Sequence, residues 1–286
     1  MKRIGNLYEK ICSIENLQLA DEKARKGKLR TYGVIEHDKK REANLLKLRE
    51  TLLNGTFHTS KYDVFTIYEP KEREIYRLPY FPDRILHHAI MNVLEPIWVS
   101  TFTADTYSCI KNRGIHAAAK KVKQALREDP EGTTFCLKLD IRKFYPSINH
   151  DVLKSILRRK LKDKRLLCLL DEIIDSADGV PIGNYLSQYF ANLYLTYFDH
   201  WIKEQKRVKH YFRYADDIVI LASDKSYLHS LMGEIRAYLG DLKLEVKGNW
   251  QVFPVAARGI DFVGYVFFHT HTRMRKGIKK TFCRRL

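Results

Sequence analysis

Two adjacent acids set between apolar runs constrain this chain more than any other feature. Asp216 and Asp217 follow the aromatic run Tyr211–Tyr214 and precede the aliphatic run Ile218–Leu221. The flanks predict two short strands, and the acids lie where the chain must turn, a place that Asp tolerates well. A surface turn with two Asp residues is ordinary, so the pair needs a second feature before it indicates chemistry.

Residues 135–141 supply that feature, because they also alternate and carry an acid near their end, Asp140. Alternate residues of a strand face opposite sides, so Leu137 and Leu139 predict an apolar face and Lys138 lies with Asp140 on the other. We therefore expect Asp140 to project from the sheet face opposite the core. Three carboxylates on neighbouring strand ends repel one another, and two divalent ions about 3.5–4 Å apart would offset this and support an in-line phosphoryl displacement.

Composition indicates a folded protein with a polyanionic partner. Hydrophobic residues make up 45% of the 286, and the net charge is +17. Such an excess favours nucleic acid as the partner. The five cysteines form no C-x-x-C pair, so we expect neither a zinc site nor a disulfide framework, and a reducing cytoplasm fits. No apolar run approaches ~18–20 residues and the start is not a signal peptide, so we expect no membrane association.

Periodicity predicts an order of elements along the chain. Helices are expected within residues 1–60, which are basic, and at 83–98, 115–128, 151–176 and 225–239, with one long helix that a glycine turn at Gly183 opens and that runs to 205. Strands are expected at 61–78 as a hairpin, at 135–140, at 211–221 around the acids, at 242–247 and as a pair within 258–268. The tail from 269 predicts the start of a basic helix.

The segments occur in the order of a known family: the sequence resembles reverse transcriptases over nearly its whole length. Residues 139–145, with Asp140, resemble the first palm motif, 182–188 the second, and Tyr214–Asp217 the third. Lys247 falls where the fourth motif carries a lysine, and 262–265 (Phe-Val-Gly-Tyr) resembles the primer-grip segment.

The second motif separates subfamilies. Intron and retroviral types usually have Gln before its glycine, whereas this chain reads Ile182-Gly183, followed by Ser187-Gln188. That form, with the segments 69–75 and 83–89, is similar to reverse transcriptases of diversity-generating retroelements. The resemblance implies copying of a template-repeat RNA with errors opposite adenines, replacement of a variable region of a target gene by the cDNA (mutagenic retrohoming), and a small basic pentameric accessory protein as partner.

The resemblance also implies the architecture. We expect an α+β right-hand polymerase whose antiparallel palm sheet is backed by helices. Fingers with an N-terminal helical extension would span 1–130, the palm 131–268, and the start of a truncated thumb 269–286. Because the family continues into a helical thumb, the thumb is expected to be largely absent here.

Site roles follow from the same motifs. Asp140, Asp216 and the Ile141 carbonyl would bind two Mg²⁺ ions, for which Mn²⁺ can substitute, and Asp217 would support one of them. The dNTP would be bound by Lys71, Arg73, Arg113, Tyr145, Ile182 and Gly183. The RNA template and the DNA or RNA primer would contact Gln188, Tyr214, Lys247, Phe262 and Gly264.

Individual residues remain open to a simpler interpretation. Lys71 and Arg73 near a hairpin tip are usually just solvated, although facing three acids and metal ions they could hold a triphosphate. Tyr145 is expected to exclude a ribose 2′-hydroxyl. Ile182 in place of Gln is expected to loosen base selection.

Other functions are compatible with parts of the pattern. The chain could be a retron, phage-defence or intron-type reverse transcriptase, although the second motif argues against that. A non-catalytic nucleic-acid-binding scaffold descended from a polymerase would have lost acids that are present here. A metal-dependent nuclease would want a nearby base for water, which the sequence does not specify.

Overall fold

The computed structural model describes residues 3–68 and 72–284, which fall into two compact units. The first unit comprises Met1–Thr101 and Ile148–Tyr194, and the second comprises Phe102–Ser147 and Leu195–Leu286. These units are groups of residues that pack together, and each contains two separate stretches of chain. The division into fingers, palm and thumb at 130 and 268 follows other borders and stays a prediction.

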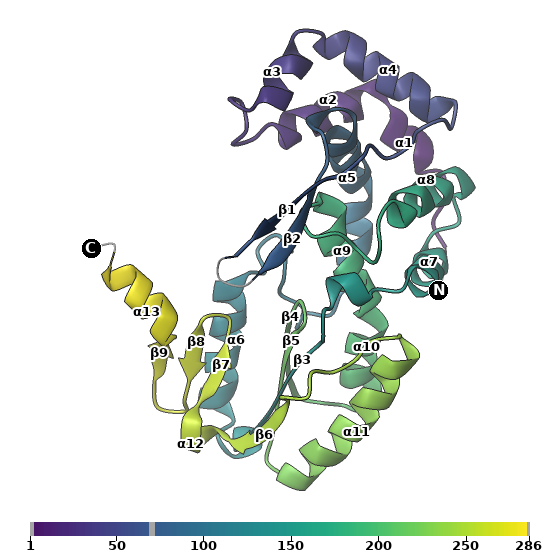
Figure 1. Ribbon diagram of the computed structural model, residues 1–286. Coiled ribbons are helices and arrows are strands. Elements are labelled where there is room, and N and C mark those ends of the chain that lie inside the picture. The colour runs from purple at the N-terminus through teal and green to yellow at the C-terminus, as the bar shows by residue number, and fades with distance from the viewer. Residues whose placement is uncertain (1–2, 69–71, 285–286) are drawn as a thin grey trace. The chain divides into compact units, whose positions relative to one another are not determined.

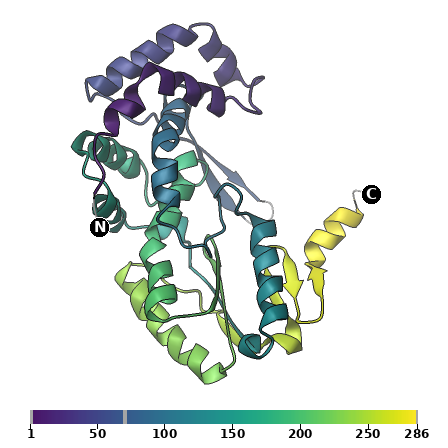
Figure 2. The same ribbon diagram turned by 180° about the vertical axis from the view of Figure 1, so that it is seen from behind.

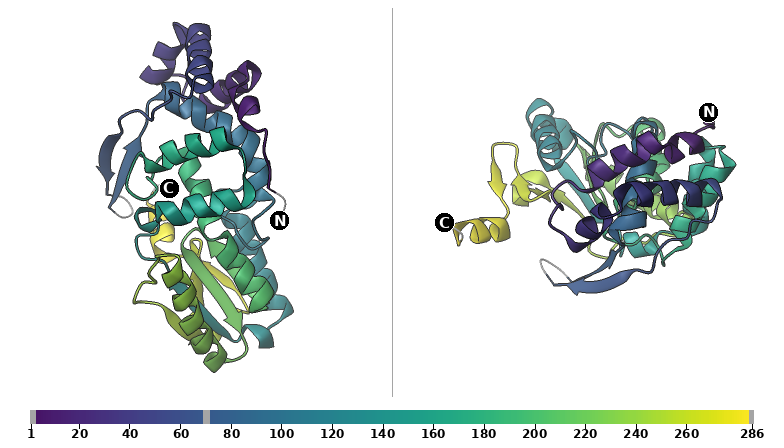
Figure 3. Two further views of the ribbon diagram at one scale, coloured as in Figure 1. Left: turned by 90° about the vertical axis from the view of Figure 1, so that its right-hand side faces the viewer. Right: turned by 90° about the horizontal axis from the view of Figure 1, so that it is seen from above.

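The first unit begins with helices and a hairpin, as predicted (Figure 1). The helices are α1 (Tyr8–Cys12), α2 (Ile14–Ala24), α3 (Tyr32–Asp38) and α4 (Arg41–Leu53). Strands β1 (Asp63–Ile67) and β2 (Arg73–Arg77) pair antiparallel and stand clear of the helices of their unit (Figure 3). A π-helical turn, η1 (Tyr80–Arg84), leads into α5 (Ile85–Val99). The buried carboxylate of Asp21 on α2 is paired with Arg25 and Arg41 and ties these helices together.

The single helix predicted for 151–176 is wrong, because the structure has two: α7 (His150–Lys160) and α8 (Lys164–Asp175). Asp163 lies between them, and its carboxylate accepts from the backbone N–H of Leu166, which caps α8. The same carboxylate accepts from the N–H groups of Leu7 and Tyr8. The break therefore serves as the attachment point of the N-terminal segment, which helical periodicity does not reveal.

The long helix predicted to run to 205 is also interrupted. It consists of α9 (Tyr185–Tyr194), α10 (Thr196–His200) and a π-helical turn, η4 (Trp201–Gln205). The backbone leaves helical geometry at Leu195, where φ is −97° and ψ is 1°. The apolar residues keep helical spacing on both sides of this break, so their pattern alone predicted one helix.

The second unit is built on a four-stranded antiparallel sheet in the order β4-β5-β3-β6. Its strands are β3 (Phe135–Asp140), β4 (His210–Tyr214), β5 (Asp217–Ala222) and β6 (Gln251–Pro254), the last of which was not predicted. Helix α11 (Lys225–Asp241) packs on β3, β5 and β6, and α6 (Ile115–Glu128) packs on β4. Figure 2 shows both helices from behind.

Both faces of this sheet are buried, which corrects the expectation that Asp140 projects from the face opposite the core. Leu137 and Leu139 are buried on one face, as predicted. Cys136, on the same face as Asp140, is fully buried in an apolar cluster that includes Val122 of α6. Asp140 therefore lies at the end of a covered face. Sequence alternation missed this because Lys138 interrupts the apolar pattern there.

The segment 242–247 is not a strand, contrary to expectation; it makes only an isolated bridge between Val246 and Ile141. Lys243 has a positive φ of 59° and its N–H bonds the Gly240 carbonyl, so these residues end α11. A short helix follows, α12 (Val255–Arg258), and then a three-stranded sheet. Its strands are β7 (Ile260–Phe262), β8 (Tyr265–Phe267) and the unpredicted β9 (Thr272–Met274).

The basic tail forms α13 (Lys276–Cys283), a helix as predicted. None of the helices described is both long and apolar enough to cross a membrane.

Candidate active site

The strand register of the second unit places the first acid beside the acid pair. Asp140 is the last residue of β3 and is the direct cross-strand partner of Asp217, the first residue of β5. Directly opposite residues of antiparallel strands have Cβ atoms about 4.5–5.5 Å apart and share a face. Asp216 precedes Asp217 in the turn, and its carbonyl accepts from the N–H of Ile141 at 3.3 Å. The backbone positions of the three predicted acids therefore lie together at one end of β3 and β5.

A strained two-residue turn presents the acid pair. Tyr214 pairs with Asp217 across the hairpin, which leaves only Ala215 and Asp216 to turn the chain. Ala215 has a φ of 55°, a conformation that costs a non-glycine residue free energy. The Arg213 side chain donates from Nη1 to the Ala215 carbonyl at 3.0 Å. This hydrogen bond stabilises the turn at the residue just before Asp216.

Arg213 is itself fixed by a buried carboxylate. Its side chain is fully buried and donates to Asp199 of α10 from Nε at 2.7 Å and from Nη2 at 2.6 Å. Asp199 also accepts from the hydroxyls of Tyr211 and Thr106. A buried ion pair is tolerated only when further hydrogen bonds satisfy it, as they do here. The guanidinium therefore has one geometry, with its third nitrogen directed at the turn that carries the acid pair.

Two lysines lie against the acids. Lys247 forms an ion pair with Oδ1 of Asp140, and its backbone N–H donates to the Asp140 carbonyl at 2.9 Å. The ammonium of Lys138 lies 3.6 Å from Oδ1 of Asp217 and donates to the Asp261 carbonyl on β7. These cations offset part of the repulsion among the acids, and Lys138 also joins the sheet to β7.

The surroundings of Asp217 disfavour its charged form. Burial raises its pKa to about 6; Lys138 opposes the increase, and the charges of Asp140 and Asp216 add to it. A carboxyl group that titrates near neutral pH within a cluster of acids is a common feature of functional sites.

The acids fit a divalent cation by their buried carboxylate oxygens rather than by a completed ligand set. Among residues 3–68 and 72–284, no three His, Cys, Asp or Glu side chains converge as a ready metal-binding group. However, Oδ1 of Asp140 and Oδ1 of Asp217 are each buried, and each faces a lysine ammonium, that of Lys247 and that of Lys138 respectively. Carboxylate oxygens of this kind suit hard divalent cations.

Tyr145 and Arg113 are two further predicted residues of this unit. Tyr145 begins a 3-10 turn after β3, and burial raises the pKa of its hydroxyl, with Cys109 and Asp216 adding to the effect. Arg113, expected to bind a triphosphate, donates to the Thr103 carbonyl at 2.7 Å. Its guanidinium is therefore engaged in holding its own loop.

The predicted primer-grip segment is a hairpin turn that begins at a buried side chain, Phe262. Phe262 is fully buried in the core of the second unit, so it can act on a primer only by holding the turn in place. Gly264 has a φ of +90°, which L side chains rarely adopt. The intervening Val263 is likewise at positive φ, 44°.

The remaining predicted residues belong to the first unit, where a tight backbone contact joins the second motif to the hairpin. The N–H of Tyr76 on β2 donates to the Ile182 carbonyl at 2.8 Å. Gly183, at φ +123°, lies so close that an added Cβ would be 2.7 Å from the Tyr76 carbonyl oxygen. Only glycine fits such an approach. Ile182 and Gly183 are therefore fixed against β2, the strand on which Arg73 lies.

Other predicted residues of this unit are placed less fully. Gln188 is exposed on α9, whereas its neighbour Ser187 is buried. Arg73 is the first residue of β2 and is exposed. Lys71 lies outside the described residues.

Sequence reasoning missed the groups that support the acids. Lys138 lies two residues before Asp140 on the same strand face, and this spacing could have identified it. Arg213, next to Tyr214, could have been suspected because a charged residue inside an apolar strand needs a buried partner. Asp199, more than ten residues away on another element, carries no local signal.

Comparison with known proteins agrees with this geometry. Residues 69–267, more than half of the chain, match the family described as reverse transcriptase (RNA-dependent DNA polymerase). The chain is 26% identical over 274 residues to protein YkfC of Escherichia coli, covering 79% of this chain and 71% of that protein. It is 23% identical over 191 residues to the group II intron-encoded protein LtrA of Lactococcus lactis, covering 62% of this chain but only 31% of that protein.

Solved structures support the fold. The apo telomerase of Candida tropicalis aligns with a TM-score of 0.54 at 12% identity, covering 76% of this chain and 49% of that one. A telomerase of Candida albicans in complex with a fragment of telomeric RNA aligns with a TM-score of 0.54 at 14% identity, covering 82% and 49%. The chain thus has the palm and fingers fold of reverse transcriptases, and it spans about half of these telomerase chains.

Proposed function

Because the chain belongs to the reverse transcriptase family, we propose that it is an RNA-directed DNA polymerase, a nucleotidyltransferase that extends a DNA or RNA primer with dNTPs on an RNA template. The observation that carries the proposal is the register of Asp140 with Asp217 beside Asp216, with a buried carboxylate oxygen on two of these acids. The net charge of +17 supports a nucleic-acid substrate.

Reverse transcriptases use divalent metal ions, and we propose Mg²⁺, with Mn²⁺ able to substitute. Asp140, Asp216 and the Ile141 carbonyl would hold two ions, with Asp217 supporting one of them. When bound, such ions lower the pKa of the primer 3′-hydroxyl and neutralise charge on the triphosphate. Lys138 and Lys247 would keep the acids close together before ions bind.

The other residues of the chain position the reactants. Arg213 would hold the turn so that Asp216 and Asp217 keep one geometry. Arg73 would bind triphosphate oxygens from the hairpin. Tyr145 would lie against the sugar and exclude a 2′-hydroxyl, which favours deoxynucleotides.

For the biological role we propose the diversity-generating retroelement type, which copies a template-repeat RNA with errors at adenines and works with a small basic pentameric accessory protein. The support is the second motif, in which Ile182 precedes Gly183 and Ser187-Gln188 follow. The Ile182 side chain offers no hydrogen bond to a base, so a polar check on the nascent pair is lost and selection is looser.

Primer extension on an RNA template tests the proposal at two levels. The wild-type chain should extend a primer only with a divalent ion, and Asp216→Ala/Asp217→Ala should not. Absence of extension even with a matched accessory protein would refute the polymerase. Ile182→Gln should reduce misincorporation opposite template adenines, and an error spectrum that does not favour adenines in the wild type would refute the retroelement role alone.

An intron-type role is the second candidate. It is favoured by the similarity to LtrA and to a nuclear intron maturase of Arabidopsis thaliana, 24% identical over 165 residues. Uniform errors at all four template bases would support it.

A further inference from the structure

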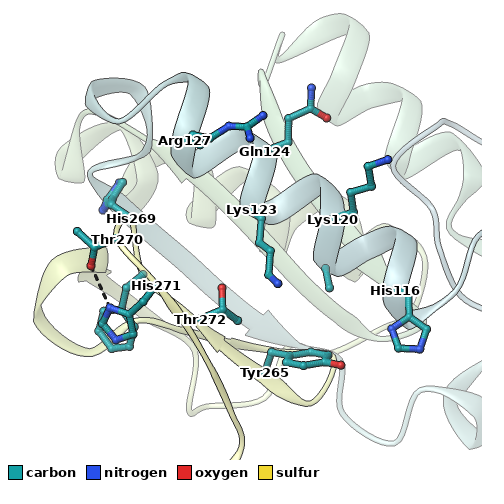
Figure 4. Close-up of a pocket in the computed structure, with 12 residues that line it drawn as sticks. His116, Lys120, Lys123, Gln124, Arg127, Tyr265, His269, Thr270, His271 and Thr272 are labelled. Atoms are coloured by element: carbon teal, nitrogen blue, oxygen red, sulfur yellow. Dashed lines mark hydrogen bonds between the residues drawn. The ribbon is translucent and has the colours of Figure 1, made fainter.

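We propose that the groove between α6 and the β8–β9 strands binds single-stranded nucleic acid, outside the catalytic turn. The groove has a volume of about 790 Å³ and lies wholly within the second unit. Figure 4 shows α6 along one side and the strands along the other. This proposal depends on the proposed function in one respect: a polymerase has a nucleic-acid strand to guide.

The cations of the groove are arranged along one stripe of the helix. Lys120, Lys123 and Arg127 line it at positions i, i+3 and i+7 of α6. This spacing places side chains on one helix face, here over about 10 Å. Arg127 forms an ion pair with Glu128, with 3.3 Å between its Nη2 and the carboxylate Oε1. Lys120 and Lys123 have no carboxylate partner among the described residues. Two exposed ammonium groups are therefore free to bind phosphates.

No acidic side chain is among the described residues that line the groove, so the charges of Lys120 and Lys123 are not neutralised within it. Another exposed lysine of the same unit, Lys209, does have a carboxylate partner, 2.6 Å away on Asp129. The absence of such a partner in the groove favours an anionic ligand over a solvated helix face.

Aromatic and imidazole rings face these cations and select the form of nucleic acid. Tyr265 lies across the groove from α6, with Lys123 pointing toward the strands between Thr272 and the Tyr265 ring (Figure 4). Tyr265 is only partly buried, and His116 and His271 are exposed. Rings beside a line of cations are the usual means of holding a single strand, because they stack on exposed bases. A duplex keeps its bases stacked on one another and has none to offer.

The groove lies next to the predicted primer-grip turn. Tyr265 directly follows Gly264, so the groove begins at the predicted primer-grip turn and continues along β8 toward His269. The helix stretch from His116 to Arg127 spans about 16 Å, enough for several nucleotides. A single strand entering or leaving the polymerase site could lie along it.

The test is the salt dependence of binding to a fluorescein-labelled 12-nucleotide single strand, measured by anisotropy. Each phosphate neutralised on a single strand contributes about 0.7 to the slope of log K against log salt. Lys120→Ala/Lys123→Ala should therefore lower the slope by about 1.4, equivalent to ~25-fold weaker binding at 0.1 M salt. The matched control, Lys225→Ala/Lys243→Ala, removes two exposed lysines, one at the start of α11 and one just after its end, and should change the slope by less than half as much.

A second variant tests the rings. Tyr265→Leu should weaken single-strand binding by at least about fivefold while leaving binding to a 12-base-pair duplex unchanged, and Tyr265→Phe should bind like the wild type. Thermal melting would confirm that each variant is folded. A single strand carrying 5-iodouracil should crosslink to the peptide that contains Tyr265 or His271.

The outcomes separate this inference from the proposed function. If both lysine pairs change the slope equally, or if duplex binding falls as much as single-strand binding, the groove is not a single-strand site, whether or not the protein extends primers. If the groove variants behave as expected but no primer is extended, the groove stands and the polymerase proposal fails.

Discussion

Arg213→Lys tests whether the buried guanidinium positions the catalytic turn or only stabilises the fold. Lysine can keep the ion pair with Asp199, but a single ammonium cannot also reach the Ala215 carbonyl, which now accepts from Nη1 at 3.0 Å. A hydrogen bond from a charged donor contributes about 1.5–3 kcal/mol. With about 1.4 kcal/mol per factor of ten, loss of turn geometry should slow nucleotide addition by roughly 10- to 100-fold.

The assay is single-nucleotide primer extension at a temperature where urea unfolding shows the variant to be folded. The matched control is Ile235→Val on α11, a buried residue away from the turn, which should cost about 0.5–1.5 kcal/mol of stability and no activity. Asp199→Asn should cost more stability, about 3–5 kcal/mol, because it leaves Arg213 charged and unpaired. If folded Arg213→Lys adds nucleotides at the wild-type rate, Arg213 is only a structural residue.

For two further substitutions the structure predicts whether the protein becomes more or less stable. The pKa of Asp217 in the folded protein, about 6, lies above its ordinary value of 3.8. Its ionisation therefore lowers the stability of the folded protein as pH rises from 3.8 through 6, by up to about 3 kcal/mol at pH 8. Asp217→Asn should therefore be more stable than the wild type in urea at pH 8 and gain little at pH 4; an equal gain at both would contradict the assignment. Gly183→Ala should destabilise by at least about 2 kcal/mol, since its Cβ would meet the Tyr76 carbonyl at 2.7 Å, whereas Gly55→Ala, also at positive φ but with nothing within 4 Å, should cost less.

Local patterns predicted the elements that carry the acids. Alternation identified β3 and the two strands β4 and β5, and Asp216 and Asp217 indicated the turn that joins β4 to β5. Their register, which pairs Asp140 with Asp217, is a long-range property that no local spacing contains. The family resemblance implied the grouping, and the structure supplied the pairing.

The incorrect predictions concern places where local spacing does not reveal how the chain packs or bends. Asp163 breaks a helix because it also binds the N-terminal segment, and Leu195 breaks another without disturbing the apolar spacing. The buried face around Cys136 was missed because Lys138 interrupts its apolar pattern, although residues of α6 and β7 cover it. At Asp163 and at Cys136, tertiary contacts override the local pattern.

The central claim is that Asp140, Asp216 and Asp217 together form the catalytic centre of an RNA-directed DNA polymerase. The most direct measurement is the rate of one dNTP addition to a primer on an RNA template, compared between the wild type and Asp140→Asn in the presence and absence of Mg²⁺. The account predicts Mg²⁺-dependent addition that Asp140→Asn lowers by at least about 10³-fold, with the fold retained in both proteins. Addition by folded Asp140→Asn at a rate near that of the wild type would contradict it.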